Sequence, residues 1–538
     1  MAVAGDAKAE GGGREARHVD GGSSSLEDKQ LAYLGNQEEH DVGKRASLRH
    51  YPVSCFWCLY AVWCVLLVSF ENQASGNILG IPEFRKDFGV PFEGGYVLPA
   101  EWQAAFSGAP VASAVIGSLG CGALADWLGR RAVIMMALVI TYAAITMEFV
   151  ATTNPMFFGG KFLNGFATGA LASVTVTYIG EVTPLALRGI FTCLSAMSYT
   201  LGPLVAALIV NETGTIPSRW AYRAVFCAQY GFAVFATIGV FFMPESPWWL
   251  ASKGQEAKAL HNLAKLGHRG EEGRKRLAVI RQTLEEVSQE TEGATYAECF
   301  RRSNLRRTVV SIAPLCIQML SGVVFAASYF TYYMQLAGFS TELSFKLQIV
   351  QQVCSLVGNV MSWYLIDRVG RRNLTFYGLL ALTINLLATG GLAAWGSPEA
   401  LKGTVGLILI YCWWYNATIG ATAFTVLCEV STSRLRIKTI AIGLAAQNLL
   451  GMAWSFVLPY LFNPDKANLG ARVAFIFGGL AVVSLVYIWY CLPETAGRTY
   501  EELDEMFIKG VPARKFKDFK PEAQTKGEEV KAAIAKSP

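Results

Sequence analysis

Long runs of apolar residues, each about 20 residues long, constrain the fold of this chain more than any other feature. An α-helix of that length crosses a hydrocarbon core of roughly 30 Å. Only 16% of the residues are charged and the mean hydropathy is +0.34, whereas soluble domains carry roughly 25% charged residues. A large soluble protein with a rich core would not gather its apolar residues into such blocks. The sequence therefore predicts an all-α membrane protein.

Twelve such runs fall into two groups of six. The first six expected spans are 53–80, 98–121, 132–152, 157–180, 189–210 and 222–243. The last six are 309–333, 344–366, 374–394, 403–428, 439–461 and 471–492. The expected organisation is a disordered cytoplasmic tail (1–50), an N-terminal half (51–244), a cytoplasmic linker with short helices (245–308), a C-terminal half (309–493) and a cytoplasmic C-terminal tail (494–538).

Three short charged motifs occur twice in the same order. The pairs are Gly122-Ala-Leu-Ala-Asp-Trp-Leu-Gly-Arg-Arg131 with Tyr364-Leu-Ile-Asp-Arg-Val-Gly-Arg-Arg372, Glu181-Val-Thr-Pro-Leu-Ala-Leu-Arg188 with Glu429-Val-Ser-Thr-Ser-Arg-Leu-Arg436, and Pro244-Glu-Ser246 with Pro493-Glu-Thr495. Their offsets of 241, 248 and 249 residues are nearly equal. A duplicated six-span unit is therefore expected, as in transporters whose halves are related by an axis along the membrane normal.

Basic residues in the short loops indicate the orientation. Lys and Arg gather in alternate loops, in both tails and in the linker, and such loops face the cytoplasm. The opposite loops then face outward. On that side the sequon Asn211-Glu-Thr213 is the candidate glycosylation site. We expect no cleaved signal peptide, because no apolar core with a small-residue cleavage site opens the chain.

The charged residues of the repeated motifs would meet at the cytoplasmic mouth. We predict that they form a charge latch, which holds the halves together on the inside and breaks when the site opens inward. Its expected members are Asp126, Arg130, Arg131, Glu181, Arg188, Glu245, Asp367, Arg371, Arg372, Glu429, Arg436 and Glu494. The alternative is that they are ordinary loop charges that obey the positive-inside rule.

These motifs resemble the signatures of sugar porters of the major facilitator superfamily, over roughly residues 53–507. The resemblance also includes Pro244-Glu-Ser-Pro247 and the closing Pro493-Glu-Thr-Ala-Gly-Arg-Thr-Tyr-Glu-Glu-Leu-Asp504. Tyr296-Ala-Glu-Cys-Phe300 and Ser431-Thr-Ser-Arg-Leu-Arg436 look most like the fungal α-glucoside (maltose-type) permeases. The resemblance implies the major facilitator fold, with twelve transmembrane helices in two six-helix halves, and transport by alternating access.

Ionisable residues inside the spans are candidates for function, because each costs about 2.5–3.5 kcal/mol at a helix centre. Glu71 in the first span and Lys161 in the fourth lie where the resemblance implies a proton-coupling carboxylate and an arginine. Lys in place of Arg loses the bidentate fork. The alternative is a static pair that only fixes the helices. Glu148, near the outer end of the third span, is expected to point to the outer interface and is given no role.

A sugar would be held by uncharged polar groups and aromatic faces. The resemblance and position imply Gln318, Asn448, Phe424 and Tyr329 as substrate-binding residues. Two positions depart from the pattern of hexose porters, since Ala196 stands in place of a glutamine and Val324 in place of an asparagine. These departures leave open a disaccharide or a molecule that is not a sugar.

The expected function is proton-coupled symport of a sugar, an α-glucoside or hexose, across the plasma membrane. The alternatives are a facilitative uniporter, a carrier of a cyclic acid or secondary metabolite, and a nutrient sensor, against which the short C-terminal tail argues. The chain lacks a phosphate-binding G-x-x-x-x-G-K-[ST] loop and an H-E-x-x-H motif, so we expect no enzyme and no cofactor. Cys55 and Cys58 have no partner ligands nearby in sequence, so we expect no metal. The expected partners are the sugar, the proton and the bilayer, without nucleic acid, and a monomer is compatible with the sequence.

Overall fold

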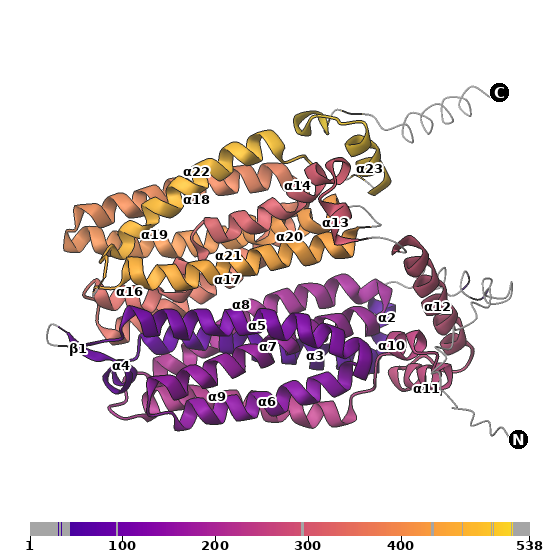
Figure 1. The fold of residues 1–538 in the computed structure, drawn as a ribbon, viewed down its shortest axis with the longest axis horizontal. Coiled ribbons are helices and arrows are strands. Elements are labelled where there is room, and N and C mark those ends of the chain that lie inside the picture. The colour runs from indigo at the N-terminus through magenta and orange to yellow at the C-terminus, as the bar shows by residue number, and fades with distance from the viewer. Residues whose placement is uncertain are drawn as a thin grey trace, which may run out of the picture.

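The computed structural model describes residues 31, 34, 44–92, 95–291, 295–431, 435–464, 466–496, 498, 500–517 and 519. The described chain is almost entirely helical, and its long helices form two bundles that lie side by side (Figure 1). The N-terminal bundle contains α3 (Pro52–Leu79), α5 (Ala100–Leu128), α6 (Arg130–Val150), α7 (Asn154–Val182), α8 (Arg188–Thr213) and α9 (Trp220–Phe242).

The second bundle repeats this arrangement with more interruptions. It contains α14 (Arg302–Leu320), α15 (Val323–Ser328), α16 (Phe330–Leu336), α17 (Thr341–Val369), α18 (Arg371–Trp395), α19 (Pro398–Ala417), α20 (Ile419–Val430), α21 (Arg436–Phe462) and α22 (Ala474–Cys491). The two bundles, here called the N-terminal half and the C-terminal half, confirm the predicted fold class.

Short elements mark the two ends of the bundles. At one end, here called the linker end, lie α2 (Lys44–His50), α10 (Pro247–Ser252), α11 (Glu256–Leu266), α12 (Glu271–Thr291), α13 (Tyr296–Cys299) and α23 (Tyr500–Ile508) (Figure 1). The opposite end carries α4 (Pro82–Phe88) and a hairpin of β1 (Val90–Phe92) and β2 (Gly95–Val97), in which Val90 pairs with Val97. Single turns of 3₁₀-helix are η1 (Leu185–Leu187), η2 (Gly470–Val473) and η3 (Ala513–Lys515).

Among the described residues, 11 helices are long and apolar enough to cross a membrane. The remaining predicted span, 309–333, is divided between α14, α15 and α16. The break lies at Gly322, whose φ is +91°, a conformation that favours glycine. The freed Ser321 carbonyl accepts a hydrogen bond of 2.7 Å from the Tyr411 hydroxyl. A broken helix is tolerated at membrane depth where such partners satisfy the backbone.

Glycines allow α5 and α7 to pack closely. A Cβ atom at Gly165 would lie 2.3 Å from the Pro110 carbonyl oxygen, and one at Gly169 would lie 2.1 Å from that of Ala114. Close approach through small residues is the usual way in which membrane helices associate. The contact fixes α7, and with it Lys161, relative to the centre of the N-terminal half.

Hydrogen bonds between the halves gather at the opposite end. Gln103 on α5 donates to Asn463 at 2.8 Å, and the Tyr332 hydroxyl on α16 donates to the same Asn463 oxygen at 2.8 Å. Arg85 donates to Gln335 at 2.6 Å, and Gln335 donates to the Gly80 carbonyl at 2.7 Å. These contacts between α3, α4, α5, α16 and α21 close the molecule at this end.

Candidate transport site

Arg130 organises a charge cluster at the linker end of the N-terminal half. Its Nη2 lies 2.8 Å from Glu181 Oε1, and its Nε donates to Glu181 Oε2 at 3.1 Å. The backbone N–H groups of Arg130 and Arg131 open α6 and donate to Glu245 at 2.9 and 3.1 Å. A carboxylate at a helix N-terminus is favoured by the helix dipole. The cluster therefore ties the ends of α6, α7 and the chain before α10 together.

Arg371 repeats this geometry in the C-terminal half. Its Nη2 donates to Glu429 Oε1 at 3.0 Å. The backbone N–H groups of Arg371 and Arg372 donate to Glu494 at 2.8 and 3.2 Å. The Thr495 hydroxyl adds a bond of 2.6 Å to Glu429 Oε2. The matching contacts are the structural counterpart of the duplicated motifs.

The other residues predicted for the latch have different environments. Asp126 lies 3.2 Å from Arg130, but 76% of its side chain is exposed. Arg188 is exposed and Arg436 is half-buried, and the side chain of Asp367 lies outside the described residues. The contacts of Arg130 and Arg371 described above join helices within one half. A latch between the halves therefore stays a prediction.

Glu71 on α3 and Lys161 on α7 meet inside the N-terminal half. Lys161 Nζ lies 2.6 Å from Glu71 Oε1, and the side chains are 1% and 3% exposed. At 1.5 Å per residue, each of the two residues lies about 10–12 Å along its helix from the end of the bundle that is opposite the linker end. The sequence predicted these two residues together, and the structure brings them into direct contact.

Glu148 on α6 joins them, so the expectation that it points to the outer interface is wrong. Its side chain is fully buried, and Oε2 lies 3.1 Å from Lys161 Nζ. Asn164 Nδ2 donates to the other oxygen at 3.0 Å. This inward orientation brings the carboxylate to the Asn164 amide and the Lys161 ammonium. The sequence signal for a role of Glu148 was an ionisable residue within an apolar run. Its position near a helix end led to the wrong expectation.

Two aromatic rings lie near the Lys161 ammonium, and a buried amide follows one of them on α9. The rings of Phe157 and Phe226 lie 5.5 and 5.6 Å from Nζ, within range of a cation–π interaction. Gln229 follows Phe226 by three residues on α9 and is fully buried, and its side-chain O and N have no hydrogen-bond partner in the described part of the chain. The charges therefore lie in a buried and partly aromatic environment.

Gln318 lies at the centre of a second polar group, in the C-terminal half. Its Nε2 donates to the carbonyls of Ile419 and Gly420 at 2.9 and 3.0 Å, beside the break between α19 and α20. Its Oε1 accepts a bond of 2.8 Å from Gln447 on α21. Sequence reasoning named the neighbouring Asn448 and missed Gln447. Only the rotation of α21 decides which of the two amides reaches Gln318.

The remaining predicted substrate residues do not contact this group directly. Asn448 and Phe424 are exposed. Tyr329 is buried and donates to Ser107 on α5 at 3.2 Å. Its ring centroid lies 6.0 Å from that of Phe462, around which Phe325, Tyr332 and Tyr333 also gather. Tyr329 thus belongs to the aromatic closure between the halves.

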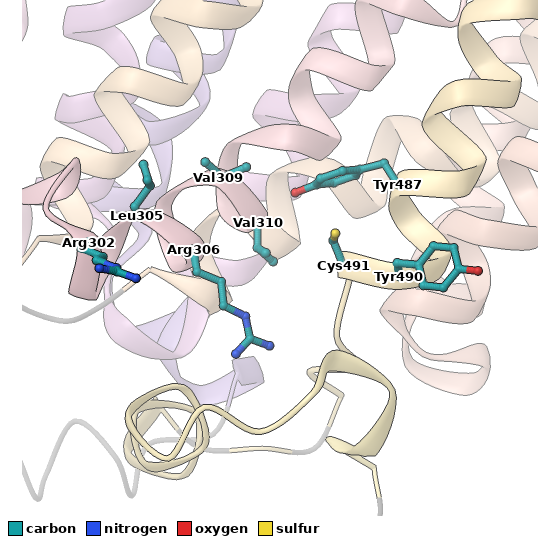
Figure 2. Close-up of a pocket in the computed structure, with 8 residues that line it drawn as sticks. All are labelled: Arg302, Leu305, Arg306, Val309, Val310, Tyr487, Tyr490 and Cys491. Atoms are coloured by element: carbon teal, nitrogen blue, oxygen red, sulfur yellow. The ribbon is translucent and has the colours of Figure 1, made fainter.

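A pocket of about 380 Å³ lies at the linker end, away from these polar groups. Figure 2 shows Arg302 and Arg306 at its rim on α14, with Tyr487 reaching across from α22 toward Val309 and Val310. The lining is mostly apolar and contains none of the predicted substrate residues. This pocket is therefore not the candidate sugar site.

Potential metal ligands and the sequon at Asn211 complete the set of sequence-predicted features. In the described ranges no group of three or more His, Cys, Asp or Glu could hold a metal ion, and Cys55 and Cys58 are buried with free thiols. Asn211 lies in the last turn of α8, half-buried, and donates to Glu212 at 2.9 Å.

Comparison with known proteins shows the family. The family described as "Sugar (and other) transporter" matches residues 57–507. A general α-glucoside permease of Saccharomyces cerevisiae is 30% identical over 490 residues, which cover 89% of this chain and 79% of the permease. A maltose permease of the same yeast is 31% identical over 504 residues, 91% of this chain and 81% of the relative.

Solved structures agree on the fold. The xylose transporter XylE from E. coli, in a partially occluded inward open conformation, aligns with a TM-score of 0.67 at 19% identity, over 84% of this chain and 99% of XylE. The proton:xylose symporter XylE with bound 6-bromo-6-deoxy-D-glucose aligns with a TM-score of 0.66 at 20% identity, over 85% of this chain and 100% of XylE. These likenesses show a major facilitator fold, and the chain belongs to the sugar (and other) transporter family as a multi-pass membrane carrier rather than an enzyme.

Proposed function

We propose that this carrier takes up a sugar across the plasma membrane together with a proton. The yeast relatives are named as α-glucoside and maltose permeases, and XylE is named as a proton:xylose symporter. An α-glucoside such as maltose is the first substrate to test. In this proposal the linker end faces the cytoplasm, as the basic loops favour, and the substrate site opens alternately to the two sides.

The observation that carries the coupling is the contact between Glu71 and Lys161. Both groups are buried, and Glu71 Oε1 lies 2.6 Å from Lys161 Nζ. A carboxylate that gains or loses a proton in such a site changes its attraction to the cation, and therefore the packing of α3 against α7. Glu71 would carry the proton and Lys161 would be its partner.

Sugar recognition is proposed for the C-terminal half. Gln318 and Gln447 supply amide groups beside the broken helix α19–α20, where backbone carbonyls are also available. A sugar hydroxyl both donates and accepts, so amides are suitable partners. Phe424 and Asn448 are on the neighbouring helices α20 and α21 and stay candidates for the same site.

Uptake measurements test this function. Labelled maltose is given to yeast cells that lack their own sugar porters, at pH 5, with and without a protonophore. We expect uptake that collapses with the protonophore, and a Glu71→Gln carrier that equilibrates maltose without accumulating it. Glu342→Gln is the matched control, because Glu342 is an exposed carboxylate that pairs with Lys346. Uptake that persists with the protonophore would indicate a uniporter, whereas absence of uptake at normal surface expression would favour a carrier of a different solute, as Ala196 and Val324 allow.

Orientation and glycosylation form a separate proposal. If the end opposite the linker faces outward, Asn211 is on the side where glycans are attached. Treatment with an N-glycosidase should then increase the electrophoretic mobility of the wild type and leave Asn211→Gln unchanged. A wild type whose electrophoretic mobility does not change would show that Asn211 carries no N-glycan.

A further inference from the structure

Glu148 gives Lys161 a second carboxylate, and the three charges do not balance. Glu71, Glu148 and Lys161 are each no more than 3% exposed in their side chains. Two ionised carboxylates with one ammonium would leave a net charge of −1 in a buried site. Like charges that share one site are not both ionised without a large cost. The cluster is therefore built to hold one further proton.

The number of oxygens that face a donor group distinguishes the two carboxyl groups. Glu148 is within reach of two donors, since Asn164 donates to Oε1 and Lys161 lies 3.1 Å from Oε2. Glu71 interacts with Lys161 through Oε1. Among the described groups, Oε2 of both glutamates lacks a hydrogen bond, but Oε2 of Glu148 is ion-paired with the Lys161 ammonium, whereas Oε2 of Glu71 has no such contact. Donors stabilise the ionised form of a carboxyl group. The ionised state is thus better supported at Glu148, and the free oxygen of Glu71 is the open position for a proton.

The helices that carry the two groups also differ. α6, with Glu148, packs against α5, α7 and α9 of its own half. α3, with Glu71, also touches the other half, because Gln73 donates to the Ala327 carbonyl at 3.2 Å. A Cβ atom at Gly76 would lie 2.7 Å from the Ser328 carbonyl oxygen. Glu71 therefore lies on a helix that contacts the C-terminal half, whereas the main contacts of α6 among the described elements are with its own half.

We propose that Glu148 is the resident counter-ion of Lys161, which allows Glu71 to take up and release the transported proton. The inference rests on the proposed proton coupling and adds a residue to it. When a proton bonds to a carboxylate oxygen of Glu71, Lys161 keeps its own proton and its positive charge stays paired with Glu148. Without Glu148, protonation of Glu71 would leave an unpaired ammonium group in the membrane, which is strongly unfavourable.

Other titratable and charged groups on the surrounding helices have partners elsewhere. Tyr222 donates to Asp87, Tyr230 pairs with Thr146, Tyr142 pairs with Thr237, Arg223 lies over the ring of Phe149, Arg85 donates to Gln335 and Glu101 lies near Lys466. The neutral amide of Gln229 faces the same side of α9 as Phe226. The proton balance of the site is therefore set by Glu71, Glu148 and Lys161.

Infrared spectroscopy of the purified full-length carrier tests this assignment without a sugar. At neutral pH the wild type should show the C=O band of one protonated, buried carboxyl group. The band should change wavenumber in Glu71→Asp and stay in place in Glu148→Asp. It should disappear in Glu148→Gln, because Glu71 must then remain ionised beside Lys161. A wild type without the band, or a band that follows Glu148→Asp, would overturn the proposal.

Transport of labelled maltose in proteoliposomes supplies the second readout. Glu148→Gln should lose accumulation driven by a proton gradient, so that the internal concentration falls to the external one, while exchange of internal for external maltose is retained. Glu148→Asp should restore accumulation. If Glu148→Gln accumulates maltose as the wild type does, Glu148 is not needed as the counter-ion. If the carrier does not transport maltose but shows the expected infrared bands, the proposed substrate is wrong and the proposed proton site still stands.

Discussion

Arg130 in the N-terminal half and Arg371 in the C-terminal half make almost the same contacts. Each guanidinium group binds a glutamate, Glu181 or Glu429, and the backbone N–H of each arginine donates to a second glutamate. Deeper in the membrane the halves differ. The N-terminal half buries Glu71, Glu148 and Lys161, whereas the C-terminal half places the amides of Gln318 and Gln447 near its broken helices.

The halves share the contacts that fix helix ends and differ in the buried polar groups. The arginine clusters fix helix ends, a task that both halves share, so duplication has left the clusters alike. The buried groups have separate tasks in our proposal, proton exchange in the N-terminal half and sugar binding in the C-terminal half. Changes at equivalent and non-equivalent positions can test this division.

Removal of the buried cation should have the largest effect. In Lys161→Met the ionised carboxylate of Glu148 loses its counter-ion, and we expect the folded state to lose about 3–5 kcal/mol. The fraction of monodisperse carrier after heating in detergent measures this loss. Lys161→Met combined with Glu148→Gln should recover part of it, because the unpaired carboxylate is then removed and Glu71 is protonated. Equal instability of the single and double variants would show that the charges do not interact.

The two arginine clusters should give similar but unequal losses. Arg130→Ala and Arg371→Ala each remove charge-assisted hydrogen bonds, and we expect about 2–3 kcal/mol from each in the same heating assay. The loss should be larger for Arg130, because the side chain of Glu181 is 15% exposed and that of Glu429 is 23% exposed.

The exposed Asp126 is the control for the cluster in the N-terminal half. Its side chain is 76% exposed, so Asp126→Ala should cost less than about 1 kcal/mol. A cost as large as that of Arg130→Ala would mean that loop charge rather than the buried contact stabilises the cluster.

Gln318→Leu should weaken sugar binding and leave coupling intact. Loss of the amide should raise the KM for maltose about tenfold, or roughly 1.4 kcal/mol, while the protonophore still abolishes accumulation. Asn385→Leu serves as a control, because Asn385 donates to the Leu407 carbonyl on another pair of helices. An unchanged KM in Gln318→Leu would place recognition elsewhere.

A small, pH-dependent effect is expected at the linker, which attaches to the N-terminal half. Burial of the His268 ring and the nearby Arg276 lower the pKa of His268 from 6.5 to about 4, against the opposite influence of Glu272. His268 lies 3.1 Å from Glu272, which also accepts from Tyr51 before α3.

The depressed pKa of His268 sets the sign of the pH effect. Between pH 6.5 and 4 the undocked linker would bind a proton that the docked linker excludes, so docking weakens as the pH falls. Burial opposes ionisation of Glu272, but hydrogen bonds from Tyr51 and His268 lower its pKa overall, which acts in the same direction at lower pH. We expect the free energy of linker docking to fall by about 1 kcal/mol between pH 7 and 5. The effect is no larger because His50 and Glu272 are partly exposed, so solvent screens their charges.

Hydrogen–deuterium exchange of α11 and α12 at pH 7 and 5 measures this effect. Faster exchange at pH 5 is expected in the wild type, after correction for the intrinsic pH dependence of exchange, and His268→Gln should remove the difference. His261→Gln is the matched control, because His261 is exposed on the same helix pair. Faster exchange at pH 7 would contradict the expected weakening of docking in acid.

The sequence alone predicted much of the fold and part of the site. Apolar runs gave the membrane helices, because helix length and hydrocarbon thickness are local constraints. The repeated motifs predicted the two halves, and the family comparison agrees. Glu71 and Lys161 were found because an ionisable residue in an apolar run is rare.

Tertiary structure decided the rest. It turned Glu148 inward toward Lys161 and Asn164, chose Gln447 rather than Asn448 as the partner of Gln318, and broke the helix at Gly322. Each outcome depends on the rotation of one helix against another. The sequence of an apolar helix without a clear polar face does not specify this rotation. Periodicity determines that a helix spans the membrane, and only packing between helices determines which buried polar groups meet.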